Sequence, residues 1–220
     1  MSILQTTQGR VIPGRTAEFL KLAGEAKKIH ERLGGRATLI NWSSAGSSTG
    51  TFGYGLVSPD FPAWGRFADA VSGDAEWLAW SQKNLGTADP SATLISQGTS
   101  ADQPGFDSTA PLAPGSVISA TTSQLVPGRS AEEVLKLAAE YKTIALALGA
   151  KMVSVRRVIY GGETSLSYTV VTVFENAAAL GDWQVKLASD AGGRAFIQAA
   201  FGPTSPFTGI SQRIGRALPF

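Results

Sequence analysis

The chain has 220 residues, a length that suits one large domain or two small ones. Hydrophobic residues make up 43% of it and charged residues only 16%, which indicates a sizeable core and a large buried interface, between repeats or between chains. The net charge is +2 and the basic residues form no run, so nucleic acid is a poor candidate partner. The lack of cysteine excludes disulfides, thiolate metal sites and a cysteine nucleophile. No apolar run reaches the roughly 18 residues of a membrane span and the first residues do not resemble a signal peptide, so we expect no membrane partner and a cytoplasmic location.

The first half of the chain is predicted to contain four strands and two helical regions. A Pro13-Gly14-Arg15 turn precedes the first helix, and Thr16 is its N-cap candidate because a hydroxyl can accept hydrogen bonds from the free amides of a first turn. Gly34 suits the left-handed position past the end of that helix. In chain order the expected ranges are strand 3–12, helix 16–33, strands 36–44 and 49–57, a helical region 61–84 broken near Ser72 and Gly73, and strand 92–97.

The second half is predicted to repeat this order. Ser130 is the N-cap candidate of its first helix, and Gly149 follows that helix. The turn 160–163 is expected to join two strands as a hairpin. The expected ranges are strand 117–126, helix 130–148, strands 151–159 and 165–173, a helical region 176–200 broken near Gly192 and Gly193, and strand 208–213.

Short sequence matches occur in the same order along both halves. They are Ile12-Pro13-Gly14-Arg15-Thr16-Ala17-Glu18 with Val126-Pro127-Gly128-Arg129-Ser130-Ala131-Glu132, Leu20-Lys21-Leu22-Ala23 with Leu135-Lys136-Leu137-Ala138, and Ile95-Ser96-Gln97 with Ile210-Ser211-Gln212. An ordered series of matches predicts a tandem duplication. We expect a first repeat over 1–98, a linker rich in proline and glycine over 99–115, and a second repeat with a C-terminal tail over 116–220.

The order β-α-β-β-α-β predicts an α+β fold in which each ferredoxin-like unit forms an antiparallel sheet with its helices on one face. Such helices leave the other face of each sheet bare. We therefore expect the two sheets to bury their bare faces against each other, so that the chain is an intrachain pseudo-dimer. Further homo-oligomers are compatible with this arrangement.

This pattern resembles the dimeric α+β barrel superfamily, and within it the NIPSNAP-like and antibiotic-biosynthesis-monooxygenase-like branches. The features that carry the resemblance are the element order, the Pro-Gly-Arg turn, the tryptophans of the second helical region and Leu85-Gly86 before the last strand. The resemblance implies a pseudo-dimeric α+β barrel. Members include cofactor-free oxygenases, haem-degrading enzymes, isomerases and proteins of no known activity, so the fold does not fix the function. The haem-degrading branch uses a histidine of the second helical region, and this chain has none there. We expect no haem, no metal and no other cofactor.

His30 and Tyr54 are the candidate catalytic residues. His30, the only histidine, falls within the apolar stripe of the first helix. It is either a base in a ligand pocket or a buried histidine bonded to a backbone carbonyl. Tyr54 and Tyr168 take equivalent places on the third strands, so they share a sheet face and either orient a ligand or pack in the core. Gly53 and Gly55 indicate a close approach, for which tight helix packing is the preferred cause.

Arg156 and Arg157 are adjacent on a strand and therefore point to opposite faces. At least one of them is expected to be partly buried with an anionic partner, which is either a ligand carboxylate or, in an internal salt bridge, one of Asp182, Asp190 and Glu175. We take Arg157 as a ligand-binding candidate. The aromatic candidates, each of which can equally be a core residue, are Trp42, Trp64, Trp77, Tyr141 and Tyr168.

Two functions remain open from the sequence. The first is a small-molecule binder, or a cofactor-independent oxygenase or isomerase, with an apolar or aromatic ligand held between a sheet and its helices. The second is a structural or interaction protein without a catalytic site. A cavity of ligand size, ~300 Å³ or more, with convergent polar groups favours the first. We expect such a pocket in one repeat rather than in both, and in the first repeat because it contains His30.

Overall fold

The computed structural model describes residues 1–44, 50–106, 111–162 and 166–220. Parts of three predictions lie outside these residues: the expected strand start at Thr49, the end of the hairpin turn at Glu163 together with the strand start at Ser165, and positions 107–110 of the linker.

Each half of the chain has the same order of strands and helices. The first half contains β1 (Ile3–Val11), α1 (Thr16–Arg32), β2 (Arg36–Ser44), β3 (Thr51–Ser58), α2 (Phe61–Gly73), α3 (Ala75–Asn84) and β4 (Ala92–Asp102). The second contains β5 (Val117–Leu125), α4 (Ala131–Ala147), β6 (Met152–Tyr160), β7 (Tyr168–Phe174), α5 (Ala177–Ser189), α6 (Ala191–Phe201) and β8 (Phe207–Ala217).

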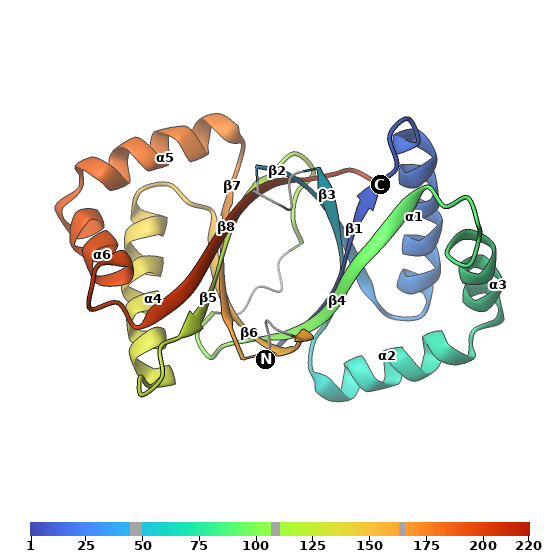
Figure 1. The fold of residues 1–220 in the computed structure, drawn as a ribbon, viewed down its shortest axis with the longest axis horizontal. Helices are drawn as coiled ribbons and strands as arrows, with labels where there is room; N and C mark the ends of the chain where they lie inside the picture. The colour runs from blue at the N-terminus through green and yellow to red at the C-terminus, as the bar shows by residue number, and fades with distance from the viewer. Residues whose placement is uncertain (45–49, 107–110, 163–165) are drawn as a thin grey trace.

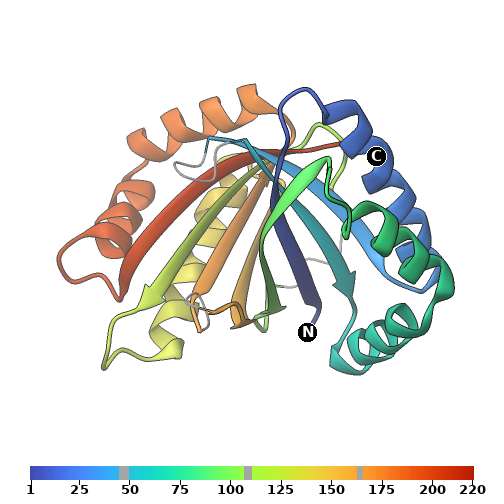
Figure 2. The same ribbon diagram turned by 45° about the vertical axis from the view of Figure 1, so that its right-hand side comes forward.

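The strands form one closed antiparallel barrel in the order β1-β3-β2-β8-β5-β7-β6-β4. Two seams join the halves: β2 pairs with β8, and β4 pairs with β6. Figures 1 and 2 show the helices outside this ring of strands, with α1 to α3 on one side and α4 to α6 on the other. The predicted α+β class is confirmed. Because the barrel is closed, each described strand pairs with a neighbour on both sides and the sheet that these strands form has no edge strand.

The core lies between the outer face of the barrel and the helices. In the first half, Phe19 and Ala23 of α1 pack on Leu39 and Phe52. In the second, Val153 and Phe174 pack against side chains from α4 and α5, namely Ala145, Leu180 and Trp183. Because side chains alternate along a strand, the residues between these core positions face the inside of the barrel.

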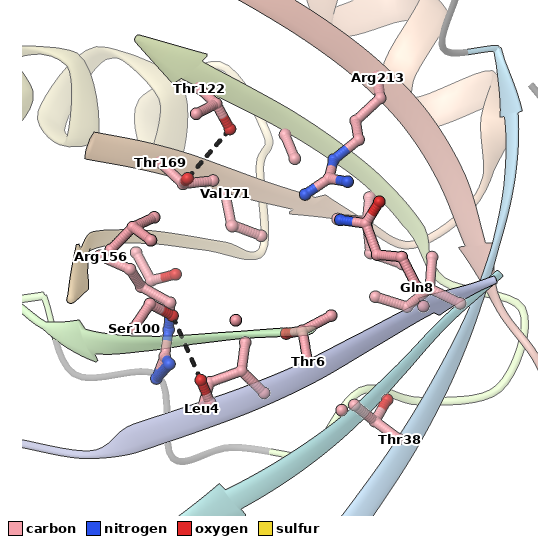
Figure 3. A pocket seen from close by; sticks show the side chains of 18 of the residues that line it. Leu4, Thr6, Gln8, Thr38, Ser100, Thr122, Arg156, Thr169, Val171 and Arg213 are labelled. Atoms are coloured by element: carbon pink, nitrogen blue, oxygen red, sulfur yellow. Dashed lines mark hydrogen bonds between the residues drawn. The ribbon is translucent and has the colours of Figure 1, made fainter. Parts of the chain in front are cut away.

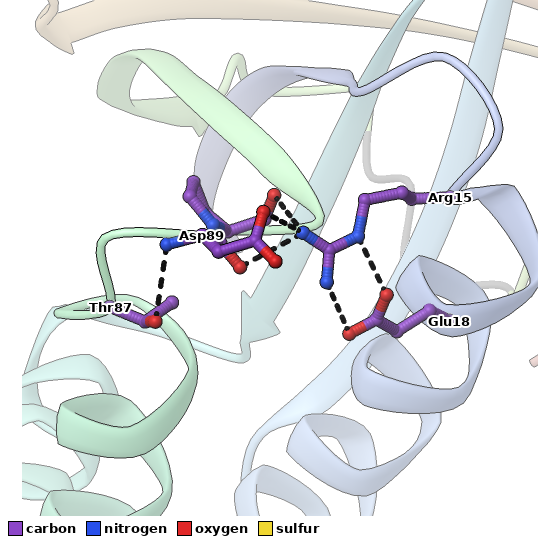
Figure 4. Close-up of polar contacts among 5 residues, drawn as sticks. Arg15, Glu18, Thr87 and Asp89 are labelled. Carbon is purple, nitrogen blue, oxygen red and sulfur yellow. Dashed lines mark hydrogen bonds and ion pairs between the residues drawn. The ribbon is translucent and has the colours of Figure 1, made fainter.

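The two Pro-Gly-Arg turns tie the start of a helix to the loop that precedes the last strand of the same half. The Arg15 guanidinium donates to the backbone carbonyl of Asp89 at 3.0 Å and forms a forked pair with Glu18 at 2.8 and 2.9 Å (Figure 4). In the second half Arg129 donates to the carbonyl of Thr204 at 3.1 Å. The arginine of the repeated turn therefore has a structural task in both halves.

Helix ends match the sequence prediction at some positions only. Gly34 and Gly149 adopt φ values of 93° and 112°, which confirms the left-handed position after each helix. Ser130 forms a capping box with Glu133 and is confirmed as an N-cap. Thr16 was the wrong choice: the N-cap position of α1 is Arg15, and no side chain caps it.

Replacing Ser130 should therefore destabilise the protein, whereas replacing Thr16 should not. We expect Ser130→Ala to lower the free energy of unfolding by about 1 kcal/mol, because an amide of the first turn of α4 loses its acceptor. The matched control Thr16→Ala should stay within about 0.5 kcal/mol of the parent. Urea unfolding followed by circular dichroism measures both; equal effects of the two substitutions would contradict the assignment of the caps.

The second helical regions break at aspartates. Asp74 accepts a hydrogen bond from the Trp77 amide at 2.8 Å, and Asp190 from the Gly193 amide at 2.7 Å, so each aspartate ends one helix and caps the next. The first break lies next to the predicted position. The second was predicted at Gly192 and Gly193, which instead fall in the first turn of α6.

The connection between the halves begins later than predicted. β4 continues to Asp102, so residues 99–102 belong to a strand and pair with β6. Beyond it, the Gln103 amide donates to the Val155 carbonyl at 2.8 Å, and Phe106 is buried in a cluster with Val134. The described part of the connection is thus packed onto the second half.

Candidate functional site

A cavity of about 630 Å³ lies inside the barrel, lined by side chains from every strand. Its volume falls within the range of small-molecule sites, roughly 300–1,000 Å³. Figure 3 shows labelled residues of opposite strands, among them Thr6, Thr122 and Arg213, around one interior space. The ligand site was predicted between a sheet and its helices, but this cavity lies on the inner face of the sheet. It is also shared by both halves, so the prediction of a pocket in a single repeat was wrong for this site.

The cavity lining is apolar in one part and polar in another. One part is apolar and belongs to a packed cluster that includes Trp42, Ile118, Ala120, Leu112 and Met152. The remainder carries hydroxyl groups, and those of Thr122 and Thr169 are hydrogen-bonded at 3.0 Å. The mixture suits an organic ligand with an apolar body and polar substituents.

Arginines are the titratable residues in the described lining: Arg36, Arg156 and Arg213. Arg156 is 3% exposed and forms a 2.9 Å ion pair with Asp102, which is fully buried. Its guanidinium also donates to the Ser2 hydroxyl at 2.8 Å, and that hydroxyl donates in turn to Asp102. Burial lowers the pKa of Arg156, and the charge of Asp102 partly offsets this effect. This cluster closes the seam between β4 and β6.

Arg213 lies over the ring of Trp42, with 4.4 Å between the guanidinium carbon and the ring centroid. Burial lowers the pKa of Arg213, although an arginine stays charged at neutral pH. Among the described residues it has neither a hydrogen bond nor an ion pair. Trp42 is 4% exposed, and its indole Nε1 is likewise buried without a hydrogen-bond partner in the described part of the chain.

Glycines on neighbouring strands make room for the Trp42 indole. A Cβ on Gly53 would lie 3.0 Å from Nε1, and a Cβ on Gly215 would lie 2.6 Å from Cε3. Gly55 similarly leaves space for Thr38 and Leu4. The close approach predicted at Gly53 and Gly55 is therefore real, but its predicted cause, helix packing, was wrong, since both glycines face the barrel interior.

Three predicted residues come together outside the barrel, between β3 and the helices. His30 Nδ1 is 2.8 Å from the Tyr54 hydroxyl, and the His30 ring is 4.4 Å from that of Trp77. His30 is 4% exposed, and burial lowers its pKa to about 4. Burial also raises the pKa of Tyr54, so both groups are neutral at pH 7. His30 is thus a buried histidine, bonded to a tyrosine rather than to the expected backbone carbonyl.

The remaining predicted residues lie away from the cavity. Trp64 donates to Gln5 at 3.2 Å, the Tyr141 hydroxyl is 2.7 Å from that of Thr172, and Tyr168 is buried against α4. Arg157 is exposed on the outer face. Of all the predicted site residues, Trp42 is the one in the cavity lining.

Sequence reasoning missed Arg213 and Gln8, which line the cavity, and of the arginine pair it chose Arg157 as the ligand-binding candidate, whereas Arg156 lines the cavity. The expectation that at least one of the pair is buried with an anionic partner is confirmed by Arg156. Alternation along β6 predicts that Arg156 and Arg157 face opposite ways, but it does not tell which of them faces inward. In the structure Val153 and Val155 pack in the clusters on the helix side, so Arg156, and not Arg157, faces the inside of the barrel. The buried partner of Arg156 is Asp102, not Asp182, Asp190 or Glu175.

The described cavity lining contains neither a carboxylate nor a histidine. It therefore offers cations, amides and hydroxyls that can bind a ligand, but no residue with the pKa of a general base at neutral pH. His30 does not fit the part of a haem ligand either, because its Nδ1 contacts Tyr54 and aromatic rings surround it. Among the described residues, no three histidine, aspartate or glutamate side chains cluster as a metal site would require.

By sequence, no known family matches the chain, and no curated protein is a recognisable relative. Its structure, however, is similar to solved ones. A proposed monooxygenase from Fusobacterium nucleatum subsp. nucleatum superposes with a TM-score of 0.63 at 11% identity, covering 99% of this chain and 93% of the other. An anthrone oxidase-like protein gives 0.60 at 10% identity, covering 99% and 92%. A proposed chlorite dismutase gives 0.55 at 13% identity, covering 99% and 95%.

The chain has the α+β barrel fold of these proteins. Identities this low show the fold and nothing of the reaction. None of the described helices is both long and apolar enough to cross a membrane.

Proposed function

We propose that this α+β barrel binds a small organic molecule with an apolar or aromatic body inside the barrel. The observation that carries the proposal is the 630 Å³ cavity, in which an apolar cluster around Trp42 and Ile118 meets hydroxyl and arginine side chains. A purely structural barrel gains nothing from such a space, because an unfilled interior forfeits packing energy.

A cofactor-independent oxygenase or isomerase is the second candidate. The names of two structural neighbours, a proposed monooxygenase and an anthrone oxidase-like protein, favour it. Against it stands the described lining, which has no carboxylate or imidazole to remove a proton from a substrate. Binding without proton transfer is the function that the lining supports better.

The barrel is also best explained as a tandem duplication of one ferredoxin-like unit. The supporting observations are the ordered sequence matches, the identical order of elements in the two halves, and first helices of 17 residues each. The proposed ligand site then lies at the interface of the two copies, as in a dimer whose subunits have been fused.

Blocking the cavity should abolish binding. We expect 2-naphthalenemethanol or 2-naphthoate to bind the parent protein by isothermal titration calorimetry, and Val171→Trp, which places an indole in the cavity, to lose that binding. Thr143→Trp is the control, because Thr143 is exposed on α4 and far from the lining. Native mass spectrometry of freshly purified protein should show a co-purified ligand that Val171→Trp lacks. Equal binding by the two tryptophan variants would contradict the site.

A further inference from the structure

We propose that Arg213, with Gln8 and Trp42, binds a carboxylate group of the ligand. This assignment rests on the proposed binding of a small molecule in the same cavity and adds the chemical class: an organic acid with an apolar or aromatic body. Figure 3 shows the end groups of Arg213 and Gln8 directed toward each other inside the barrel, although they come from different strands, β8 and β1.

Three groups that can donate hydrogen bonds lie together here, and none of them donates to a described residue. They are the Arg213 guanidinium, the Gln8 carboxamide and the buried Trp42 Nε1, none of which has a hydrogen bond to another described residue. They are neighbours, because Gln8 pairs directly with Gly53 and the Trp42 indole lies against that glycine. Trp42 is buried, whereas Gln8 and Arg213 are half-buried. Buried donors in native proteins almost always have a partner, so the unpaired Trp42 Nε1, with two further donors beside it, points to an acceptor that the described residues do not supply.

The positive charge of Arg213 indicates that this acceptor is an anion. Other arginines of the described structure, among them Arg15, Arg32, Arg129 and Arg156, form ion pairs with carboxylates. Among the described residues, the partner of the Arg213 guanidinium is the face of the Trp42 ring, which offsets part of the cost of taking a cation out of water. A planar carboxylate matches the fork of a guanidinium and leaves its second oxygen free to accept from an amide or indole N–H.

The surroundings indicate what the carboxylate is attached to. The same part of the cavity carries Ile118, Ala120 and Met152, which pack in the cluster around Trp42. An inorganic anion would leave this apolar surface without a partner, whereas an aromatic or aliphatic acid would cover it. The position equivalent to Arg213 in the first half is Gly98, so the repeat does not supply a second copy of this site.

The test compares an acid with its neutral counterpart. We expect the parent protein to bind 2-naphthoate about tenfold to a hundredfold more tightly than 2-naphthalenemethanol, the range that a charge-assisted hydrogen bond provides. Arg213→Gln should remove this preference while leaving the affinity for the alcohol unchanged. Arg157→Gln, which removes an exposed arginine of the outer face, is the matched control and should keep the preference.

Gln8→Leu provides a second variant in case Arg213→Gln fails to fold, and it should weaken binding of the acid more than binding of the alcohol. Circular dichroism and the unfolding midpoint establish that each variant is folded. If acid and alcohol bind the parent equally, or if Arg213→Gln and Gln8→Leu both keep the preference, the carboxylate site is wrong while the proposed function stands. If neither probe binds the parent, both the proposed function and this site are wrong.

Discussion

Asp102→Ala should lower the free energy of unfolding by about 3–5 kcal/mol, a cost typical of breaking a buried ion pair on one side. The substitution leaves the guanidinium of Arg156 buried at the seam of β4 and β6, where it has lost the carboxylate of Asp102. Because both residues are buried, hydration offsets little of the loss of that partner. Urea unfolding at neutral pH measures the loss as a lower midpoint.

Two further variants show whether the unpaired charge is the cause. Glu175→Ala breaks the exposed ion pair with Lys151 and should change stability by no more than about 0.5 kcal/mol. The double variant Asp102→Ala with Arg156→Met removes the buried charge as well, and should recover most of the stability lost in the single variant. A double variant as unstable as the single one would show that Asp102 stabilises the seam by some means other than pairing with Arg156.

The local structure could be predicted from the sequence because its signals are local. The Pro-Gly-Arg turns, the glycines after α1 and α4, and the alternating strands all depend on residues near each other in the chain. Closure of the barrel depends on a seam between β4 and β6 that gave no such signal. Asp102 stands just before Pro104 and Gly105, so the end of β4 that contains it, residues 99–102, was predicted to be linker.

The site was harder to predict than the fold for a related reason. Assigning residues to a sheet requires only their periodicity, but choosing the inner face requires knowing which face the helices cover. His30 was correctly placed on the apolar stripe of its helix, and in the structure it meets Tyr54 and Trp77 on the helix side of the sheet, where the ligand was expected. The cavity lies on the other face. Trp42 was named as a candidate because aromatic side chains commonly line ligand pockets. Gln8 was not, because a single glutamine on a strand looks like a solvent-exposed residue.

His30 should make the protein less stable as the pH falls from 6.5 to 4. In the unfolded chain its pKa is near 6.5, and in the folded protein burial lowers the pKa to about 4. The unfolded state therefore takes up the proton first on acidification, so stability is complete above pH 6.5 and is lost toward pH 4. A pKa difference of this size corresponds to roughly 3 kcal/mol in full, of which about 2–3 kcal/mol is lost by pH 4.5.

The measurement isolates His30 by comparison with His30→Gln, which keeps a polar partner for the Tyr54 hydroxyl but does not titrate. Free energies of unfolding in urea at pH 7.5 and 4.5 should differ by about 2–3 kcal/mol more in the parent than in His30→Gln, while the carboxylates contribute equally to both proteins. Because His30 is the only histidine, its imidazole also gives a single set of proton resonances, whose titration reports the folded-state pKa directly. Parallel stability profiles, together with a midpoint near 6.5 for those resonances, would show that the imidazole is open to solvent and that its aromatic surroundings, Trp77 above all, do not enclose it in solution.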